Sequence, residues 1–238
     1  SVKCLFNYDG NCCNYYYQDA GGGVLTFDSP VVEIDAGFQH TCALLESGDV
    51  TCWGRRSYGQ VGDEIPSGGP ASAETPVVVD LGIGVAATQI SVAGDGSCAL
   101  LDNDTIKCWG NNNDGQLGPG WKSTHQHTPE EVATGAQYGF PISVSLGPVH
   151  GCAVMSSRNV LCWGTNGAGQ IGRNTIGNSQ WFTPSAVYLE SNTLAEAVSV
   201  EPASTCLLRT DAQLECWGGN YGTNGTSGPQ SVDTVDFG

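Results

Sequence analysis

The stretch CALLDNDTIKCWG, residues 98–110, is one of four copies of a cassette in which a cysteine, nine further residues and the sequence Cys-Trp-Gly follow one another. The other copies span residues 42–54, 152–164 and 206–218, so consecutive copies begin 56, 54 and 54 residues apart. A fixed period of about fifty residues is the sequence signature of propellers, solenoids and other repeat arrays. The cassette therefore decides the fold.

Within each cassette the two cysteines are placed to face each other across a hairpin. They are symmetric about a central turn residue, which is Asn103 in the quoted copy and Ser47, Ser157 and Asp211 in the others. Opposed residues in a non-hydrogen-bonded antiparallel pair have Cα atoms about 4.5 Å apart, which is within disulfide range. Closing such a loop stabilises a fold by about 3 kcal/mol in the chain-entropy estimate. We therefore predict four structural disulfides, with a redox role as the alternative: Cys42–Cys52, Cys98–Cys108, Cys152–Cys162 and Cys206–Cys216.

The stretches around the cassettes are strand-like. When residues 75–118 are taken as one repeat, short apolar or alternating runs at 75–79, 89–94, 98–101 and 105–110 are separated by glycine and polar turn residues. Such runs are typical of β-strands, and no helical periodicity of useful length occurs. The sequence predicts an all-β chain with four antiparallel strands in each repeat.

The cysteine content also bears on the compartment. Eleven cysteines, eight of them at one spacing, are typical of a disulfide framework, whereas a zinc site would need closely spaced Cys pairs. Disulfides persist in oxidising environments, so we expect a secreted protein or one on the extracellular surface. Ser1 starts in a strand-like stretch with no signal peptide before it, so we expect a mature chain or a fragment.

Charge and hydropathy narrow the class of partner. The formal net charge is −16 with only eight Lys and Arg, so phosphate backbones and anionic membrane surfaces are repelled. No apolar run is long enough to span a bilayer. We expect protein partners, self-assembly included, and no nucleic acid or membrane span.

A glycine-rich loop follows three of the cassettes and ends in Gly-Gln, an apolar residue and Gly, at 59–62, 115–118 and 169–172. The fourth repeat departs from this pattern, with Gly-Thr-Asn-Gly at 222–225. Glycine at these positions indicates positive φ or a close backbone approach. We expect the Gln amides to satisfy buried backbone groups between repeats. A substrate-binding Gln triad is the alternative.

These motifs together resemble the regulator of chromosome condensation repeat. The residues that carry the resemblance in the first copy are His-Thr-Cys-Ala-Leu-Leu at 40–45, Ser-Gly-Asp-Val at 47–50, Cys-Trp-Gly at 52–54 and the loop at 59–62. The match is closer to a Cys-paired variant of that repeat found in extracellular and bacterial surface proteins, and it covers about residues 30–238. The resemblance implies a β-propeller, usually of seven four-stranded blades. Here it implies about four full blades plus half repeats at the ends, with one disulfide per blade.

The residue two positions before the first cassette cysteine differs between the copies. Histidine stands two residues before the first cassette cysteine only at His40 and His150, while Gly96 and Ser204 take its place in the other copies. The signature is therefore not a histidine-based site.

The two ends of the chain are divergent. Residues 2–10 look like a degraded copy of the stretch from Ile106 to Gly115, and residues 229–232 and 235–238 match strands that precede a cassette. Either the two halves complete a fifth blade, or the chain is part of a longer propeller; we favour the second, because the first-cysteine strand is missing from both ends. We expect residues 1–31 to form a divergent N-terminal half repeat and residues 32–238 to form one domain of tandem repeats.

Three cysteines lie outside the cassettes, and two Asn-x-Thr sequons occur in turns. Cys4, Cys12 and Cys13 form an odd set, so we expect one of the last two to pair with Cys4 and the other to bond outside this chain; a buried free thiol is the alternative. Asn103 and Asn224 begin Asn-x-Thr sequons in turns, and both are candidate N-glycan sites if the source is eukaryotic.

Candidate partner-binding residues lie in the variable insertions, because repeat folds gather insertions on one binding face. The aromatic candidates are Trp121, Trp181, Phe182, Tyr138 and Phe140. The sequence Arg55-Arg56-Ser57-Tyr58 adds the only paired basic site of an acidic chain, suited to an acidic neighbour. Loop packing and a solvated loop are the alternatives.

No catalytic constellation is found. The chain has no nucleophile elbow, no phosphate-cradling loop and no calcium-loop spacing, and we predict neither an enzyme nor a cofactor. His125 and His127 could ligate a metal but lack a third ligand nearby, so we expect no metal site. We expect a non-enzymatic extracellular interaction or structural module, a building block of a cell-surface or filamentous assembly through propeller-loop contacts. The alternative is a secreted protein inhibitor of an enzyme, as in a similar propeller that inhibits β-lactamase.

Overall fold

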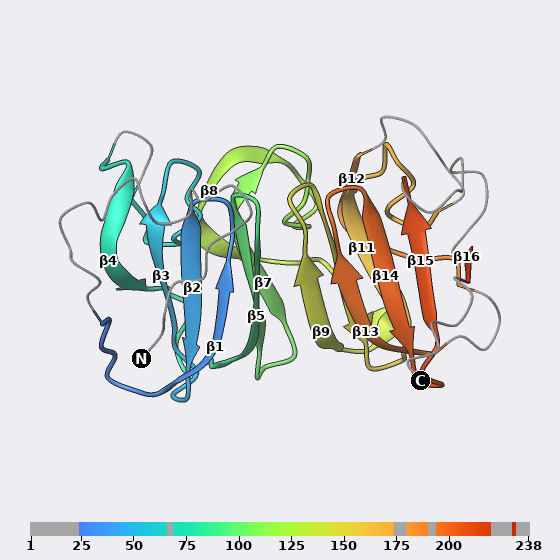
Figure 1. Cartoon of the computed structure of the whole chain (residues 1–238), viewed down its shortest axis with the longest axis horizontal. Helices are drawn as coiled ribbons and strands as arrows, with labels where there is room; N and C mark the ends of the chain where they lie inside the picture. The colour runs from blue at the N-terminus through green and yellow to red at the C-terminus, as the bar shows by residue number, and fades with distance from the viewer. Residues whose placement is uncertain (1–23, 66–68, 174–179, 190–193, 220–229, 232–238) are drawn as a thin grey trace.

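Four sheets of four antiparallel strands stand side by side along the molecule (Figure 1). The computed structural model describes residues 24–65, 69–173, 180–189, 194–219 and 230–231 of the 238-residue chain. The first two sheets contain β1 (Val31–Ala36), β2 (His40–Leu45), β3 (Val50–Arg55) and β4 (Ser72–Val78), then β5 (Ala87–Ala93), β6 (Gly96–Leu101), β7 (Ile106–Asn112) and β8 (Ser123–Glu131). The last two contain β9 (Pro141–Leu146), β10 (His150–Met155), β11 (Val160–Thr165) and β12 (Gln180–Ala186), then β13 (Ala195–Val200), β14 (Ser204–Arg209), β15 (Leu214–Gly218) and β16 (Gln230–Ser231). A short 3-10 helix, η1 (Ala136–Tyr138), precedes β9.

Each sheet is a propeller blade, so the all-β prediction with four-stranded blades is confirmed. The boundaries of the blades differ from those of the repeat that the sequence predicts at residues 75–118. Residues 72–78 form β4, which pairs with β3 and closes the first blade, so the stretch 75–118 contains strands of two blades. The reason is that an apolar run beginning with Pro fits the outer edge of one blade as well as the start of the next. Gln230–Ser231 pairs with β15 in the same way and supplies the outer strand of the fourth blade.

The predicted disulfides form at the centre of the hairpins. In all four the Cα atoms are 4.1 Å apart, and the cysteines are direct cross-strand partners, for example Cys98 with Cys108. The residue after each predicted turn centre adopts positive φ, as Gly48 does in the first blade and Asp104 in the second. The spacing within the cassette thus fixes both the turn and the staple.

The core lies between the blades rather than within one of them. Each of three apolar clusters joins the disulfide face of one blade to the tryptophan face of the next. In the first cluster Cys42 and Cys52 pack with Trp109, and the second and third clusters repeat this with Trp163 and Trp217. We call each of these contacts a seam. Because every blade needs its neighbour to bury its faces, the blades are stable as an array.

A hydrogen bond crosses every seam at the tryptophan. The indole N–H donates to the backbone carbonyl of the loop glutamine in the preceding blade: Trp109 to Gln60 at 3.0 Å, Trp163 to Gln116 at 2.7 Å and Trp217 to Gln170 at 2.8 Å. The last glycine of the loop leaves room for the ring. A Cβ on Gly118, whose φ is +72°, would lie 2.9 Å from Nε1 of Trp163.

The inner strands β1, β5, β9 and β13 are linked by a second set of bonds. Side chains of one inner strand accept from backbone N–H groups at the edge of the next, as Asp35 does from Val92 at 2.7 Å and Ser91 from Leu146 at 2.9 Å. Gln89 both accepts from the N–H and donates to the carbonyl of Val144, at 3.0 and 3.1 Å. An exposed strand edge is thereby paired by side chains, which keeps it from pairing with another chain.

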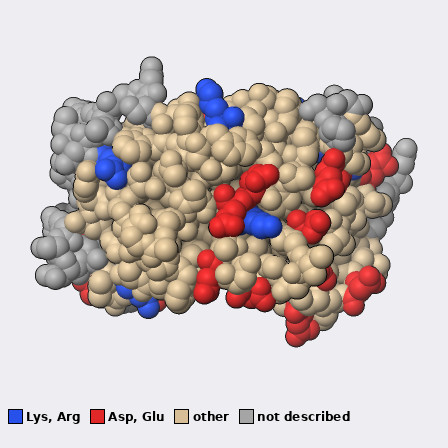
Figure 2. All heavy atoms as spheres, turned by 180° about the vertical axis from the view of Figure 1, so that it is seen from behind, with Lys and Arg blue, Asp and Glu red and all other residues tan. Residues whose placement is uncertain are grey.

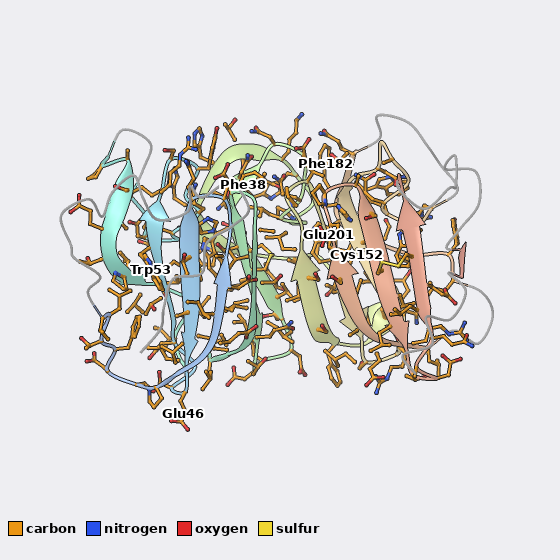
Figure 3. All side chains as sticks on the ribbon, in the orientation of Figure 1. Phe38, Glu46, Trp53, Cys152, Phe182 and Glu201 are labelled. Carbon is orange, nitrogen blue, oxygen red and sulfur yellow. A yellow bond between two sulfur atoms is a disulfide. The ribbon has the colours of Figure 1, made fainter. Side chains whose placement is uncertain are left out.

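The molecule has two different ends. We call the end with the β1–β2 and β3–β4 loops and their repeats the loop end, and the end with the cassette turns and blade connections the turn end. Figure 3 labels Phe38 and Phe182 toward the loop end and Glu46 at the turn end. The β3–β4 loop is the longest connection within the first blade, and it lies at the loop end. The insertions of variable length are therefore at this end.

The seam predicts a difference between two glycines of equal φ. Gly118 and Gly84 both have φ of +72°, but a Cβ on Gly84 would meet nothing within 4 Å. Alanine at either position costs about 1–2 kcal/mol for the left-handed backbone. Only Gly118→Ala also collides with Trp163, so we expect it to lower the free energy of unfolding by about 1–3 kcal/mol more than Gly84→Ala in denaturant titrations. Equal losses for the two variants would contradict the seam.

Candidate interaction surfaces

Two seams contain a buried histidine relay. His40 Nε2 lies 2.8 Å from the Ser97 hydroxyl, which donates to the same Gln60 carbonyl that the indole N–H of Trp109 reaches. In the seam between the third and fourth blades, His150 and Thr205 repeat the arrangement at 2.8 Å, with Gln170 as the acceptor. Burial lowers the pKa of both histidines to about 3, so both are neutral at physiological pH. They are parts of the seams, in line with the interpretation that the signature is not a histidine-based site.

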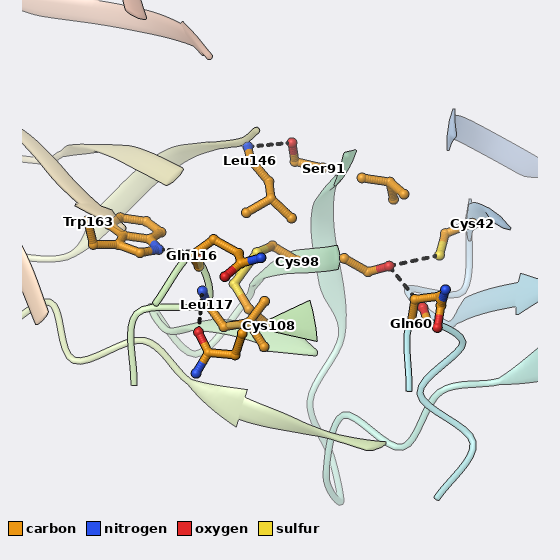
Figure 4. Close-up of a disulfide and its surroundings, with 12 residues drawn as sticks. Cys42, Gln60, Ser91, Cys98, Cys108, Gln116, Leu117, Leu146 and Trp163 are labelled. Carbon is orange, nitrogen blue, oxygen red and sulfur yellow. Dashed lines mark hydrogen bonds between the residues drawn. A yellow bond between two sulfur atoms is a disulfide. The ribbon is translucent and has the colours of Figure 1, made fainter. Parts of the chain in front are cut away.

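The seam between the second and third blades lacks both side chains of this relay, the histidine and the hydroxyl. Gly96 replaces the histidine in the second blade, and Gly151 replaces the hydroxyl residue in the third. Leu146 occupies the space, because its Cδ2 lies 3.1 Å from where a Cβ of Gly96 would be. Figure 4 shows this region, with Leu146 bonded to Ser91 near the Cys98–Cys108 disulfide. The two substitutions are matched across the seam, so the residues of neighbouring blades are specific to each other.

The loop glutamines hold the seams. Their side chains are 0–2% exposed, so they form no accessible substrate-binding triad. Each Oε1 accepts from the backbone N–H two residues earlier, and Gln116 Nε2 donates to the carbonyl of Pro148 in the next blade at 3.3 Å. Gln60 instead donates to the Asp95 carboxylate at 3.1 Å, and burial raises the pKa of that carboxyl. The expectation that the amides satisfy groups between repeats is confirmed for Gln116.

The paired arginines of the first blade have different surroundings. Arg56 is buried and forms a 2.7 Å ion pair with Asp63, whose side chain is 3% exposed. A buried ion pair needs both partners, so Arg56 is held inside the protein. Arg55 is partly exposed, donates to the Gln39 side chain at 2.7 Å and lies over the ring of Tyr58 at 5.3 Å.

The ring of Tyr58 in the first blade stacks with two histidine rings of the second blade. Its ring is 5.6 Å from that of His125, which is 5.9 Å from the nearly parallel ring of His127. Burial, and next the neighbouring His125, lower the pKa of His127. No group of three or more His, Cys, Asp or Glu able to hold a metal occurs among the described residues. The stack therefore joins two blades at the loop end.

Two aromatic candidates pack into the molecule. Phe182 covers the loop of the second blade, since a Cβ on Gly115 would lie 2.5 Å from its ring. Trp181 packs against the third apolar cluster, and the Arg173 guanidinium lies 4.9 Å from its ring. Both side chains are only partly exposed, and contacts within the fold account for them.

The other aromatic candidates divide between the two ends. Trp121, on the β7–β8 loop at the loop end, is 44% exposed, and its carbonyl accepts from Asn112 at 2.8 Å. Phe140 is 47% exposed at the turn end, where the neighbouring Tyr138 packs partly against the second cluster. The candidates thus do not form one face. Ile83, which no sequence motif marks, is fully exposed between two glycines, and these glycines are the only sequence signal for it.

The charge of the surface matches the composition. Figure 2 shows acidic side chains over the right half of one face and along its lower edge, with few basic side chains among them. Asn103 is exposed at a hairpin tip, where the Thr105 hydroxyl donates to its side chain at 2.7 Å. Asn224, Cys4, Cys12 and Cys13 lie outside the described residues. In the described part, no helix has the length and apolarity needed to cross a bilayer.

Comparison with known proteins agrees with the division into blades. The family described as "Regulator of chromosome condensation (RCC1) repeat" matches residues 31–60, 87–116 and 142–170, which cover the inner strands, cassettes and loops of the first three blades. The chain therefore contains RCC1 repeats. The predicted family and the Cys-paired blades are thus confirmed.

Among curated relatives, the probable E3 ubiquitin-protein ligase HERC4 of Mus musculus is 27% identical over 213 residues, which are 87% of this chain and 20% of that protein. The probable E3 ubiquitin-protein ligase HERC6 of Homo sapiens is 30% identical over 215 residues, 85% of this chain and 20% of that protein. The chain therefore spans about a fifth of the length of these relatives. The crystal structure of human WBSCR16 shares the fold with a TM-score of 0.74 at 21% identity, over 89% of this chain and 55% of that one.

The buried histidines predict that acid destabilises the seams. Their folded-state pKa of about 3 is below the ordinary value of 6.5, so their stabilisation is complete above that value and is lost as the pH falls from 6.5 toward 3. Between pH 7 and pH 4.5 we expect the unfolding free energy of the native chain to fall by roughly 2–3 kcal/mol more than that of His150→Gln, which cannot titrate at this site.

The effect of the carboxylates on stability cancels when the native chain is compared with His150→Gln. Burial raises the pKa of Glu33 and Asp35, which acts in the opposite direction, but both proteins contain them. His125→Gln is the control, because it removes a partly exposed histidine and leaves both relays intact. Denaturant titrations across the pH range measure the effect, and parallel curves for the native chain and His150→Gln would contradict it.

Proposed function

We propose that this chain is a non-enzymatic protein-interaction module of an extracellular assembly, at a cell surface or in a filament. RCC1-type propellers are interaction modules, and the described residues of the four blades include no group of His, Cys, Asp or Glu able to hold a metal ion. The observation that carries the proposal is Trp121. Its side chain is 44% exposed on a loop that the Asn112 side chain anchors to β7, so an aromatic anchor is presented in a fixed place.

The extracellular setting is supported by the four disulfides. Each hairpin is closed by one, and none of the eight cysteines serves a metal or a reactive site in the described structure. Structural disulfides of this density are typical of oxidising compartments. The exposed Asn103 is a glycan site in this proposal, and loss of mass on glycan removal from material made in a eukaryotic secretory host tests it.

The relatives named as ubiquitin ligases do not extend this proposal. This chain matches a fifth of their length, so ligase activity stays a property of those proteins. The alternative function, a secreted inhibitor of an enzyme, uses the same loop end but requires a discrete monomer. Light scattering of the non-reduced chain separates the two, because a monomer at every concentration contradicts assembly and favours the inhibitor.

The anchor role of Trp121 predicts a selective loss of binding. We expect Trp121→Ala to weaken capture of the extracellular partner at least tenfold while changing the melting temperature little, because the side chain is exposed and its backbone bond remains. Phe140→Ala, which removes a similarly exposed aromatic at the turn end, is the matched control. The measurement is quantitative mass spectrometry of extracellular proteins retained on the native chain and on each variant. Identical retained sets for the native chain and Trp121→Ala would overturn the proposal.

A further inference from the structure

A small groove opens at the turn end of the first blade. It has a volume of about 290 Å³ and lies between the cassette turn, the end of β4 and the connection from β4 to β5. Figure 3 labels Glu46, the residue at the start of this cassette turn, at the lower edge of the molecule. Pockets for small ligands begin at roughly 300 Å³, so the groove suits one large side chain. The aliphatic side chains that line it are Val78, Val79, Leu81 and Val85, and we call it the turn-end groove.

Two acidic side chains also line the turn-end groove. Asp49 and Asp80 belong to its lining, and both are exposed. Each makes one local hydrogen bond: Asp49 accepts from the Ser47 hydroxyl at 2.8 Å, and Asp80 accepts from the backbone N–H of Gly82 at 2.9 Å. No ion pair among the described residues includes either carboxylate. Both are therefore available to a cation that enters the groove.

The apolar surface of the turn-end groove is also uncovered. Val78 in its lining is 64% exposed, and Ile83 in the connection beside it is fully exposed. Lys107 is the one basic side chain of the described residues that bonds to the lining, and its ammonium donates to the carbonyl of Leu81 at 3.0 Å. The two carboxylates outnumber this cation. The groove thus fits an apolar side chain that stands next to a positive charge.

The loop end presents that pair of side chains. Trp121 is 44% exposed, and Lys122 beside it is exposed as well. Among the described Lys and Arg residues, Lys122 alone takes part in no hydrogen bond or ion pair. The other described basic side chains are bonded within the fold, and they are Arg55, Arg56, Lys107, Arg158, Arg173 and Arg209.

We propose that Trp121 and Lys122 of one copy of this chain dock in the turn-end groove of a second copy. The indole covers the aliphatic lining, and the ammonium of Lys122 bonds to the carboxylates of Asp49 and Asp80. Charge complementarity selects a second copy, because the unbonded cation of this acidic chain stands beside its exposed tryptophan. The inference rests on the proposed assembly function and names the partner of the Trp121 anchor.

The two docking elements lie at opposite ends of the molecule, so they cannot meet within one copy. Each copy carries one Trp121–Lys122 pair at the loop end and one groove at the turn end. The contact is therefore heterologous, and copies add loop end to turn end into an open filament unless a rotation closes them into a ring.

Net charge limits the strength of the contact. Each copy has a formal net charge of −16, so two copies repel each other at long range. At about 0.15 M salt the Debye length is about 8 Å, which screens this repulsion more than it screens a pair of charges in contact. We expect weak association that depends on concentration at this salt.

Charge reversal on the two sides of the contact tests the proposal. Sedimentation velocity from micromolar to submillimolar concentration should show self-association of the native chain. Lys122→Glu and Asp80→Lys should each weaken it at least tenfold, because each places like charges in contact. The double variant should recover at least part of the lost affinity, because the charges are then exchanged. The matched control is Glu196→Lys, the same charge change at an exposed position of β13 outside the groove, which should associate as the native chain does.

Two precautions keep the comparison clean. Thermal melting verifies that each variant folds, and Asp49→Lys replaces Asp80→Lys if the latter unfolds. All variants are made in the same host, so that Asn103 in the neighbouring turn carries the same modification in each.

The outcomes separate this contact from the proposed function. Association of the native chain that neither charge reversal weakens would overturn the contact and leave the assembly function standing, because the copies would then meet through another surface. Weakening without recovery in the double variant would also overturn the pairing of Lys122 with the groove. A native chain that is monomeric at every concentration would overturn both the contact and the assembly, and the groove would then be left to a basic segment of another protein.

Discussion

The hydrogen bond from the cassette tryptophan to the glutamine carbonyl of the preceding blade is the interaction on which the rest of the structure depends. A buried indole N–H without an acceptor costs about 1–3 kcal/mol, so Trp163 requires a blade that offers the Gln116 carbonyl in the right place. The loop can offer it only because Gly118 has positive φ and no side chain. Cysteine, tryptophan and the loop thus act as one unit that spans two blades, and the second and third blades each donate one such bond and accept another.

Much of this architecture could be predicted from the sequence because it is local. The distance from Cys98 to Cys108 fixes a hairpin, its turn and its disulfide within eleven residues. The seams could not be predicted, because their partners are far apart: Gln116 and Trp163 are separated by 47 residues, and His40 and Ser97 by 57. No local pattern pairs such residues until the blades are in register. For the same reason the sequence assigns the run 75–79 to the second repeat, whereas residues 72–78 close the first blade.

The candidate binding residues illustrate a second limit. Phe182 and Trp121 both lie in insertions outside the cassette, and nothing in the sequence distinguishes them. The fold does, because Phe182 covers Gly115 of the neighbouring blade, whereas Trp121 is 44% exposed and is held through its backbone carbonyl. Arg56 was grouped with Arg55 by adjacency, yet it turns inward to Asp63. In contrast, the matched glycines Gly96 and Gly151 are visible in the sequence once the seam explains why they should change together.

The most direct test of this account is hydrogen exchange of the indole N–H groups, resolved by NMR and assigned with single Trp→Phe variants. The account predicts that the indole N–H groups of Trp109, Trp163 and Trp217 exchange slowest and that the N–H of Trp121 exchanges at a rate close to that of free indole. The three seam tryptophans should also lose protection together as denaturant is added, because each seam supports the next blade. Exchange of these three groups as fast as that of Trp121 would contradict the central claim that the seams hold the blades together.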